Sequence, residues 1–212
     1  MKVLFYGDSI TDAGRNRETP LPNLYLGYGY ATIAAGKMYA KDLGKYDVYN
    51  RGISGNRTVD IYARIKNDCW SIEPDVLSIL IGVNDIWHDI GDHPNGVEPE
   101  RFERIYRMIL TDTIERLPKT KIILCEPFAL YAEANREIGD IINALPTYTN
   151  IVKKIAEEFK LPLVLLQDKL TEAGEKHGNT AILQDGIHPT VKGASVIAEE
   201  WYKVFEKVEA EM

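Results

Sequence analysis

Short apolar runs alternate along the chain with longer segments in which apolar residues recur every three or four positions. Five runs predict buried strands, over residues 2–6, 46–49, 76–81, 121–125 and 163–166. The third of them is apolar on both faces, which is typical of a central strand in a parallel sheet. Strands that alternate with helices form a parallel sheet with right-handed crossovers, so we predict an α/β fold with helices on both faces.

The segments between the strands predict amphipathic helices. The clearest runs from Glu100 to Leu117 and stops before Pro118. Thr58 is a predicted helix cap. The last helix is predicted to bury Ile197, Trp201, Val204 and Phe205. That last helix covers residues 191–209, and the other helices are predicted over residues 27–43, 58–73, 141–159 and 168–176. Residues 50–57 are predicted to form a glycine-bearing loop.

Composition narrows the class of protein. The 212 residues fit one domain (residues 1–212), and 45% hydrophobic with 27% charged residues is ordinary globular composition. The net charge is −7 and no basic stripe is present, which argues against a nucleic-acid partner. No apolar run approaches the roughly 20 residues that cross a bilayer. One lysine precedes the first strand instead of a signal peptide, and Cys69 and Cys125 look like reduced core thiols, so we expect a cytoplasmic protein.

Candidate chemistry follows the predicted strands. Ser9, Gly55 and Asn84 lie just after the first three strands, and Asp185 and His188 lie in the last loop. The carboxyl ends of parallel strands share one edge, so a hydroxyl, a loop glycine, an amide and an acid–imidazole pair would meet there. These are the parts of acyl transfer by covalent catalysis. Taken singly, each residue has a structural explanation.

Those alternatives are specific. Asn84 alone could tie down a loop, and Gly55 alone could serve a turn that needs positive φ. Asp185 and His188 alone could be a surface pair or half of a metal site. A metal site needs further ligands, and the other three histidines (His88, His93 and His177) show no ligand spacing with this pair.

Four blocks in the chain resemble, in order, the signature blocks of the SGNH, or GDSL, hydrolases. They are Gly7 to Ile10, the Gly55 loop, Gly82 to Asp85, and Asp185 to Pro189. The resemblance spans nearly the whole chain. It implies a flavodoxin-like three-layer sandwich with a five-stranded parallel sheet in the order 2-1-3-4-5. It also implies ester hydrolysis with no metal and no other cofactor.

The resemblance also implies a role for each matching residue. Ser9 would be the nucleophile, His188 its general base, and Asp185 the carboxylate that orients the imidazole. The backbone N–H groups of Ser9 and Gly55, with the side-chain amide of Asn84, would form the oxyanion hole. It is the resemblance that selects Gly55 rather than Gly52.

The substrate class follows from a narrower resemblance. Residues 12–15, 50–56 and 82–87 look like the intracellular acetylxylan esterases of this superfamily, which are small carbohydrate deacetylases. Trp87 would stack on a sugar, wall the acyl pocket or belong to the core. Arg15 and Asp8 are candidate substrate contacts, although Asp8 is also placed to shape the turn. The further polar candidates at this edge are Asn16, Arg17, His88, His93, Tyr131 and Arg136.

Two rival functions stay open. The same triad serves thioesterases and lysophospholipases, which would need an apolar pocket for a long acyl chain. A ligand-binding module without catalysis is the other alternative, because a fold alone does not fix function. The sequence leaves formation of a homo-oligomer open as well.

Overall fold

The core of the protein is a five-stranded parallel sheet in the order β2-β1-β3-β4-β5, as predicted. Residues 1–18, 25–90 and 94–212 are described by this computed structural model. The strands are β1 (Lys2–Gly7), β2 (Asp47–Gly52), β3 (Val76–Leu80), β4 (Lys121–Cys125) and β5 (Leu163–Val164). β1 lies between β2 and β3, so the crossovers run outward on either side of it and the loop after β1 lies at the switch point.

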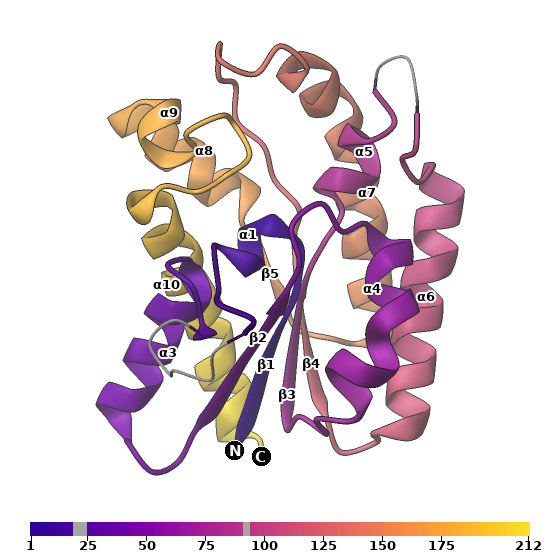
Figure 1. Cartoon of the computed structure of the whole chain (residues 1–212), viewed down its shortest axis with the longest axis vertical. Coiled ribbons are helices and arrows are strands. Elements are labelled where there is room, and N and C mark those ends of the chain that lie inside the picture. Colours follow the sequence, from indigo (N-terminus) through magenta and orange to yellow (C-terminus); the bar gives the residue numbers. More distant parts are fainter. Residues whose placement is uncertain (19–24, 91–93) are drawn as a thin grey trace.

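Helices cover both faces of this sheet (Figure 1). On one face α3 (Tyr30–Lys41) packs on α10 (Val191–Ala210), with α8 (Gln167–His177) and α9 (Asn179–Ile182) beside α10. On the other face lie α4 (Thr58–Ile65), α6 (Pro99–Arg116) and α7 (Ile138–Phe159). The short helices are α1 (Ser9–Asp12), α5 (Val83–Trp87) and the π-helix η1 (Lys66–Trp70). Both termini lie at the edge opposite α1 (Figure 1), so the α1 edge is left to the strand-end loops.

Aromatic packing fixes α10 against the sheet. Trp201 is fully buried, lies 4.6 Å from the ring of Phe5 and stacks on Phe205. Its indole N–H donates to the hydroxyl of Ser78 at 2.8 Å, which satisfies a polar group inside β3. The predicted burial of Ile197, Trp201 and Phe205 is confirmed, whereas Val204 is only half-buried because it lies toward the side of the helix that faces solvent.

Several predicted boundaries were wrong. β2 continues through Asn50 to Gly52, which were predicted to be loop. The buried Asn50 amide donates to the carbonyls of Thr11 and Leu26, so tertiary contacts satisfy a polar side chain within a strand. β5 ends at Val164 rather than residue 166, because the amide of Leu166 turns to the carboxylate of Glu126.

Several helices also differ from the prediction. Residues 83–87, which no predicted helix includes, form α5, which begins after Gly82 at φ +136°. Thr58 begins α4 but does not cap it, because its hydroxyl donates to Asp85. The helix predicted over residues 58–73 gives way to the π-helix at Lys66. Pro146 lies inside α7, which continues through it without a break.

The remaining sequence predictions on bulk properties concern the thiols and the membrane. Cys69 and Cys125 are both buried and free, as expected for core thiols. Within residues 1–18, 25–90 and 94–212, no helix combines the length and apolarity that a membrane span requires.

Candidate active site

Three side chains from distant parts of the sequence meet above the end of β1. The Ser9 hydroxyl lies 2.9 Å from Nε2 of His188, and Nδ1 of His188 lies 2.7 Å from Oδ2 of Asp185. If Nδ1 carries the proton of a neutral ring, it donates to the carboxylate and leaves Nε2 free to accept from the serine hydroxyl. The three groups are therefore connected by hydrogen bonds in the order that a serine–histidine–aspartate triad uses.

The acid–base pair is held almost entirely by its own short segment. Oδ1 of Asp185 accepts from the backbone N–H groups of Ile187 at 3.0 Å and His188 at 2.8 Å. Gly186 turns the segment at φ +87°, and a Cβ there would lie 2.3 Å from the carbonyl oxygen of Leu130. Both side chains of the pair are 31% exposed, so the pair faces solvent while the turn below it is rigid.

The contacts of the pair shift both pKa values. Burial alone would raise the pKa of Asp185, but the hydrogen bonds from the His188 ring and from the two backbone amides outweigh it and lower that pKa to about 2. The hydrogen bond to Asp185 raises the pKa of His188, and partial burial opposes that rise. Asp185 is thus ionised at neutral pH and stabilises the protonated imidazole.

Ser9 is placed by a tight turn out of β1. Gly7 allows the turn, since a Cβ there would lie 2.2 Å from the carbonyl oxygen of Leu80 on the neighbouring strand. Asp8 then caps α1, with Oδ1 accepting from the amide of Ile10 at 2.9 Å. The serine is half-exposed as the first residue of α1, so its hydroxyl reaches the edge of the sheet.

Three N–H groups were predicted to form an oxyanion hole, and each has a donor hydrogen without a partner in the described residues. Asn84 is 4% exposed, and its Nδ2 donates one hydrogen to the carbonyl of Asn56 at 3.0 Å. The second hydrogen of that amide is left for a ligand. Gly55 turns its loop at φ +80°. Among the described residues, the backbone amides of Ser9 and Gly55 have no hydrogen-bond partner in the protein.

Asp85 and Thr58 are a functional contact that the sequence reasoning missed. The fully buried carboxylate of Asp85 accepts from the Thr58 amide at 3.0 Å and from its hydroxyl at 2.5 Å. The contact joins the residue after Asn84 to the start of α4, three residues after Gly55. It therefore ties the start of α5, which carries Asn84, to the loop that carries Gly55. The only sequence signal was the adjacency of Asp85 to Asn84.

The three tentative substrate residues lie in different settings. Trp87 is half-buried, 6.1 Å from the His188 ring, and its indole N–H donates to Glu137. The Arg15 guanidinium donates through Nε to the carbonyl of Gly52 at 2.8 Å. Asp8 is 1% exposed and turned into the protein. Trp87 is thus beside the triad, Arg15 is tied to the end of β2, and Asp8 supports the turn.

The other polar candidates are spread around the same edge. His88 is half-buried, and burial is the main cause that lowers its pKa. Tyr131 and Arg136 are exposed, and His93 lies outside the described residues. Glu126, directly after β4, anchors the segment after β5, since its carboxylate accepts from the amides of Leu166 and Gln167 and pairs with Lys153.

A small cavity opens directly beside the triad. It measures about 90 Å³ and is lined by residues of the first loop, of the start of α3 and of the Asp185–Pro189 segment: Ser9, Ala13, Tyr28, Gly29, Gln184 and His188. A larger groove, about 570 Å³, lies between α8 and α10 and contains none of the side chains of Ser9, His188 and Asp185. The space at Ser9 therefore suits a small group. No group of three or more histidine, cysteine, aspartate or glutamate side chains among the described residues could hold a metal ion.

Comparison with known proteins agrees with this architecture. Residues 5–196 match the GDSL-like lipase/acylhydrolase family. The acetylxylan esterase of Geobacillus stearothermophilus is 35% identical over 207 residues, which cover 95% of this chain and 92% of that protein. A GDSL-like protein from Parabacteroides merdae ATCC 43184 superposes with a TM-score of 0.91 at 36% identity, over 97% of this chain and 95% of the other.

Two crystal structures of catalytic mutants of the Geobacillus esterase, Axe2, are similar as well. One has an aspartate and the other a serine replaced by alanine, and they superpose with TM-scores of 0.84 and 0.83. They are 34% and 33% identical to this chain, and each pair covers 96% of this chain and 93% of the other. With the family match across most of its length, this chain belongs to the GDSL-like lipase/acylhydrolase family, whose members hydrolyse esters.

Proposed function

We propose that this protein is a serine esterase that removes acetyl groups from small carbohydrates such as acetylated xylo-oligosaccharides. The observation that carries the proposal is the continuous chain of contacts from the Ser9 hydroxyl through His188 to Asp185. The 35% identity to an acetylxylan esterase supports the acetyl-sugar substrate. The small cavity beside Ser9 supports a short acyl group.

In the proposed mechanism, His188 takes the proton of Ser9 as the serine oxygen attacks the ester carbonyl. The N–H groups of Ser9, Gly55 and Asn84 donate hydrogen bonds to the carbonyl oxygen and stabilise the negative charge that develops on it. His188 returns the proton to the leaving sugar hydroxyl, which leaves Ser9 acetylated. Water, deprotonated by the same imidazole, then releases acetate and restores the serine.

The decisive comparison is kcat/KM for acetyl, butyryl and octanoyl esters of one alcohol, together with release of acetate from acetylated xylo-oligosaccharides. We expect the rate to fall steeply with chain length, because each added methylene needs apolar surface worth about 0.8 kcal/mol that a 90 Å³ cavity does not provide. A preference for octanoyl esters without sugar deacetylation would transfer the protein to the lysophospholipase or thioesterase class.

The catalytic assignment has its own control. Ser9→Ala should reduce esterase activity by at least about 10³-fold, because the nucleophile is lost. Ser71→Ala, an exposed serine on the π-helix side, should keep wild-type activity. Activity of Ser9→Ala within tenfold of wild type would sink the catalytic role and favour a ligand-binding module. The cytoplasmic location and the number of subunits stay predictions that these assays do not address.

A further inference from the structure

Three arginines gather beside the catalytic loops without enough carboxylates to neutralise them. We call Arg15, Arg17 and Arg51 the arginine cluster. Arg17 pairs with Asp12, whereas the other two bond uncharged groups of the described residues. Arg15 donates to a backbone carbonyl, and Arg51 donates to the Tyr25 hydroxyl at 3.1 Å. Asp12 is thus the one carboxylate bonded to the cluster in the described part of the chain.

A fourth arginine, Arg64, adds to the excess of positive charge around the arginine cluster. Arg64 bonds Asp68 at 2.6 Å and also donates to the carbonyls of Gly7 and Arg51. The four guanidinium groups therefore bond only two carboxylates of the described residues, those of Asp12 and Asp68. Burial, and then the nearby charge of Arg17, lower the pKa of Arg15. This positive region is unusual in a chain of net charge −7.

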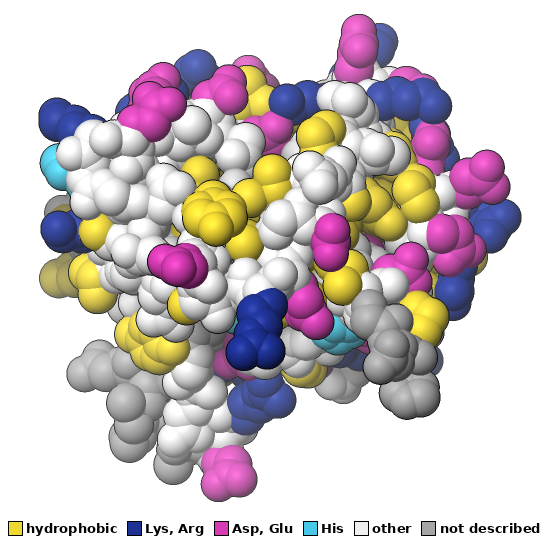
Figure 2. Space-filling view, turned by 90° about the horizontal axis from the view of Figure 1, so that it is seen from above, with side chains coloured by type: hydrophobic (Ala, Val, Ile, Leu, Met, Phe, Trp, Pro, Cys, Tyr) yellow, Lys and Arg dark blue, Asp and Glu magenta, His cyan; other side chains and the backbone are white. Residues whose placement is uncertain are grey.

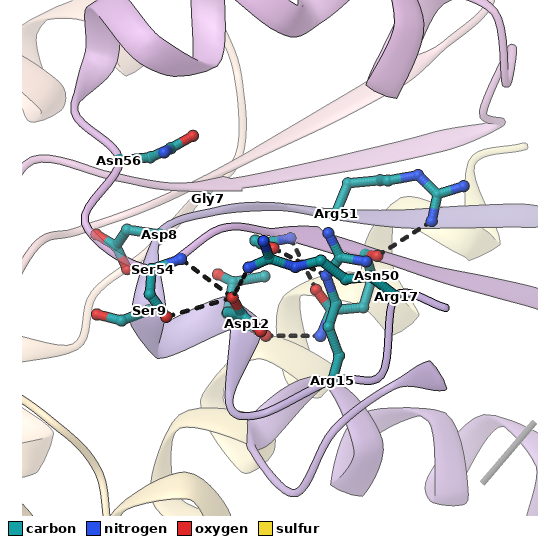
Figure 3. Close-up of polar contacts among 12 residues, drawn as sticks. Gly7, Asp8, Ser9, Asp12, Arg15, Arg17, Asn50, Arg51, Ser54 and Asn56 are labelled. Atoms are coloured by element: carbon teal, nitrogen blue, oxygen red, sulfur yellow. Dashed lines mark hydrogen bonds and ion pairs between the residues drawn. The ribbon is translucent and has the colours of Figure 1, made fainter. Parts of the chain in front are cut away.

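The cluster is attached to the oxyanion loop through one shared carboxylate. Oδ2 of Asp12 accepts from the amide of Ser54 at 3.1 Å and from its hydroxyl at 3.3 Å, and it also pairs with Arg17. Ser54 directly precedes Gly55. Figure 3 shows the arginines on the far side of Asp12 from Ser9, toward β2. A group bound there would lie beside the reacting ester rather than on it.

The cluster keeps donors free for a ligand. Arg15 uses only Nε, Arg17 only Nη2 and Arg51 only Nη1 in its bonds to other described residues. Arg17 is 48% exposed, and the face seen from above in Figure 2 carries Lys and Arg side chains below its centre. Planar guanidinium groups with parallel N–H bonds suit the two oxygens of a carboxylate or phosphate.

We propose that Arg15, Arg17 and Arg51 form a subsite for an anionic group, a carboxylate or a phosphate, carried by the acetylated sugar. The proposal rests on the proposed function and extends it. Acetylated sugars with a uronic acid and acetylated sugar phosphates share this chemistry, and the experiment separates them. In either case the anion anchors the substrate while the ester reaches Ser9.

The test compares kcat/KM for three acetylated sugars that differ in one substituent: a neutral one, one with a carboxylate and one with a phosphate. At low salt we expect at least one anionic ester to exceed the neutral ester by about tenfold or more, the effect of a charge-assisted hydrogen bond. The ratio should fall toward one in ~0.5 M salt, which screens exposed charges. The larger of the two ratios identifies the anion.

The double variant Arg17→Gln/Arg51→Gln should bring the ratio close to one. Lys119→Gln, which removes one positive charge from an exposed position just before β4, should keep the ratio. Equal rates on all three esters in wild type would overturn the subsite, and so would a preference that survives in the double variant. Thermal melts of both variants establish that they fold.

Failure of the proposed function gives a different result. If none of the sugar esters is hydrolysed while a simple acetyl ester is, the carbohydrate assignment is wrong. The subsite is then tested by calorimetry with glucuronate and glucose 6-phosphate on wild type and the double variant. Binding that the double variant loses supports the subsite, and no binding of either compound to wild type overturns it.

Discussion

The two halves of the candidate active site are held in opposite ways. Asp185 and His188 are three residues apart, are 31% exposed, and are fixed mainly by bonds within residues 185–188. The oxyanion side is buried and long-range: Asn84 reaches Asn56, and Asp85 reaches Thr58, 27 residues away in sequence. We call the Asp185–His188 pair the local half, because contacts within one short segment hold it. We call the oxyanion side the long-range half, because contacts between distant elements of the fold hold it.

This difference separates activity from stability. A change in the local half removes a chemical step but leaves few buried groups without partners. A change in the long-range half leaves a buried donor or acceptor unsatisfied, which costs about 1–3 kcal/mol per group. Substitutions in the two halves should therefore differ in the ratio of lost activity to lost stability.

The largest loss of activity is expected from Asp185→Asn. The amide oxygen can still accept from the two backbone N–H groups, but the charge that holds the imidazole in its reactive tautomer is gone, and kcat should fall by about 10⁴-fold. Steady-state kinetics and a thermal melt check both parts. Asp168→Asn, at an exposed position in α8, is the matched control. A large drop in melting temperature, or a kcat within tenfold of wild type, contradicts this interpretation of the local half.

The next largest loss of activity is expected from Asn84→Ala, which removes a side-chain amide from the long-range half. It should lower kcat by about 10²–10³-fold with little change in KM, because the lost N–H acts on charge that develops in the transition state. It should also destabilise the protein, since the carbonyl of Asn56 loses its partner. Asn67→Ala, at an exposed position in the π-helix, provides the control. A rise in KM alone would make Asn84 a substrate-binding residue.

The contrast also explains what the sequence could predict. The strand Lys121 to Cys125 was predicted to the residue, because an apolar run between a turn and a proline leaves no alternative. Sheet order and the proximity of Ser9 to His188 followed from the family resemblance and from the shared strand edge. The pairing of Asp185 with His188 was predicted from the resemblance of Asp185 to Pro189 to a family block, and the contact itself is local in sequence.

Long-range polar contacts were not predictable in the same way. Asn50 looks like a loop residue until the carbonyls of Thr11 and Leu26 are seen to accept from its side chain. Thr58 looks like a helix cap until Asp85 takes its hydroxyl. α5 depends on Gly82 at φ +136°, which a strand-like apolar run conceals. For Asn50 and Thr58 the deciding partner is far away in sequence, so no local pattern records it.

Thr58→Val should lower stability more than activity, whereas Asp185→Asn should lower activity more than stability. Valine keeps the shape and the backbone N–H, but the Asp85 carboxylate loses the hydroxyl that binds it at 2.5 Å. We expect a stability loss of about 1–3 kcal/mol and a fall in kcat of only about tenfold. Thr58→Ser, which restores the hydroxyl, should recover most of both. Denaturant titration with parallel kinetics measures the pair of values, and unchanged stability would remove the Asp85 contact from the long-range half.

The pH profile sharpens the account of the local half. The base must be neutral, so kcat/KM should fall on the acid side as His188 is protonated. Asp185 raises the pKa of His188, so the midpoint should lie above the ordinary imidazole value of about 6.5. In His88→Gln the midpoint should not move, because His88 is no part of the triad. A wild-type rate that stays constant down to pH 5 would exclude a histidine base.

The smallest effect on activity is expected from Asp8→Asn. This variant measures how much stability the protein loses by burying a carboxylate beside the long-range half. Burial, partly offset by the bond from Ile10 and by His188, raises the pKa of Asp8 to about 7. Its Oδ2 has no hydrogen-bond partner among the described residues, and Asp85, whose pKa burial also raises to about 7, lies close enough to repel it. The asparagine oxygen can still cap α1, so kcat should stay within about tenfold.

The stability of Asp8→Asn should depend on pH with a definite sign. The folded protein binds the Asp8 proton more tightly than the unfolded chain, whose pKa is about 3.9, so this group makes wild type less stable as pH rises from about 4 to 7. Asp8→Asn should therefore gain on wild type between pH 5 and pH 8, by on the order of 1–4 kcal/mol. Thermal melts at the two pH values measure the difference, with Asp168→Asn as the control. If the variant instead loses stability relative to wild type at pH 8, the loops around Ser9 stabilise the Asp8 carboxylate as an anion. Burial of that charge then does not lower the stability of the protein.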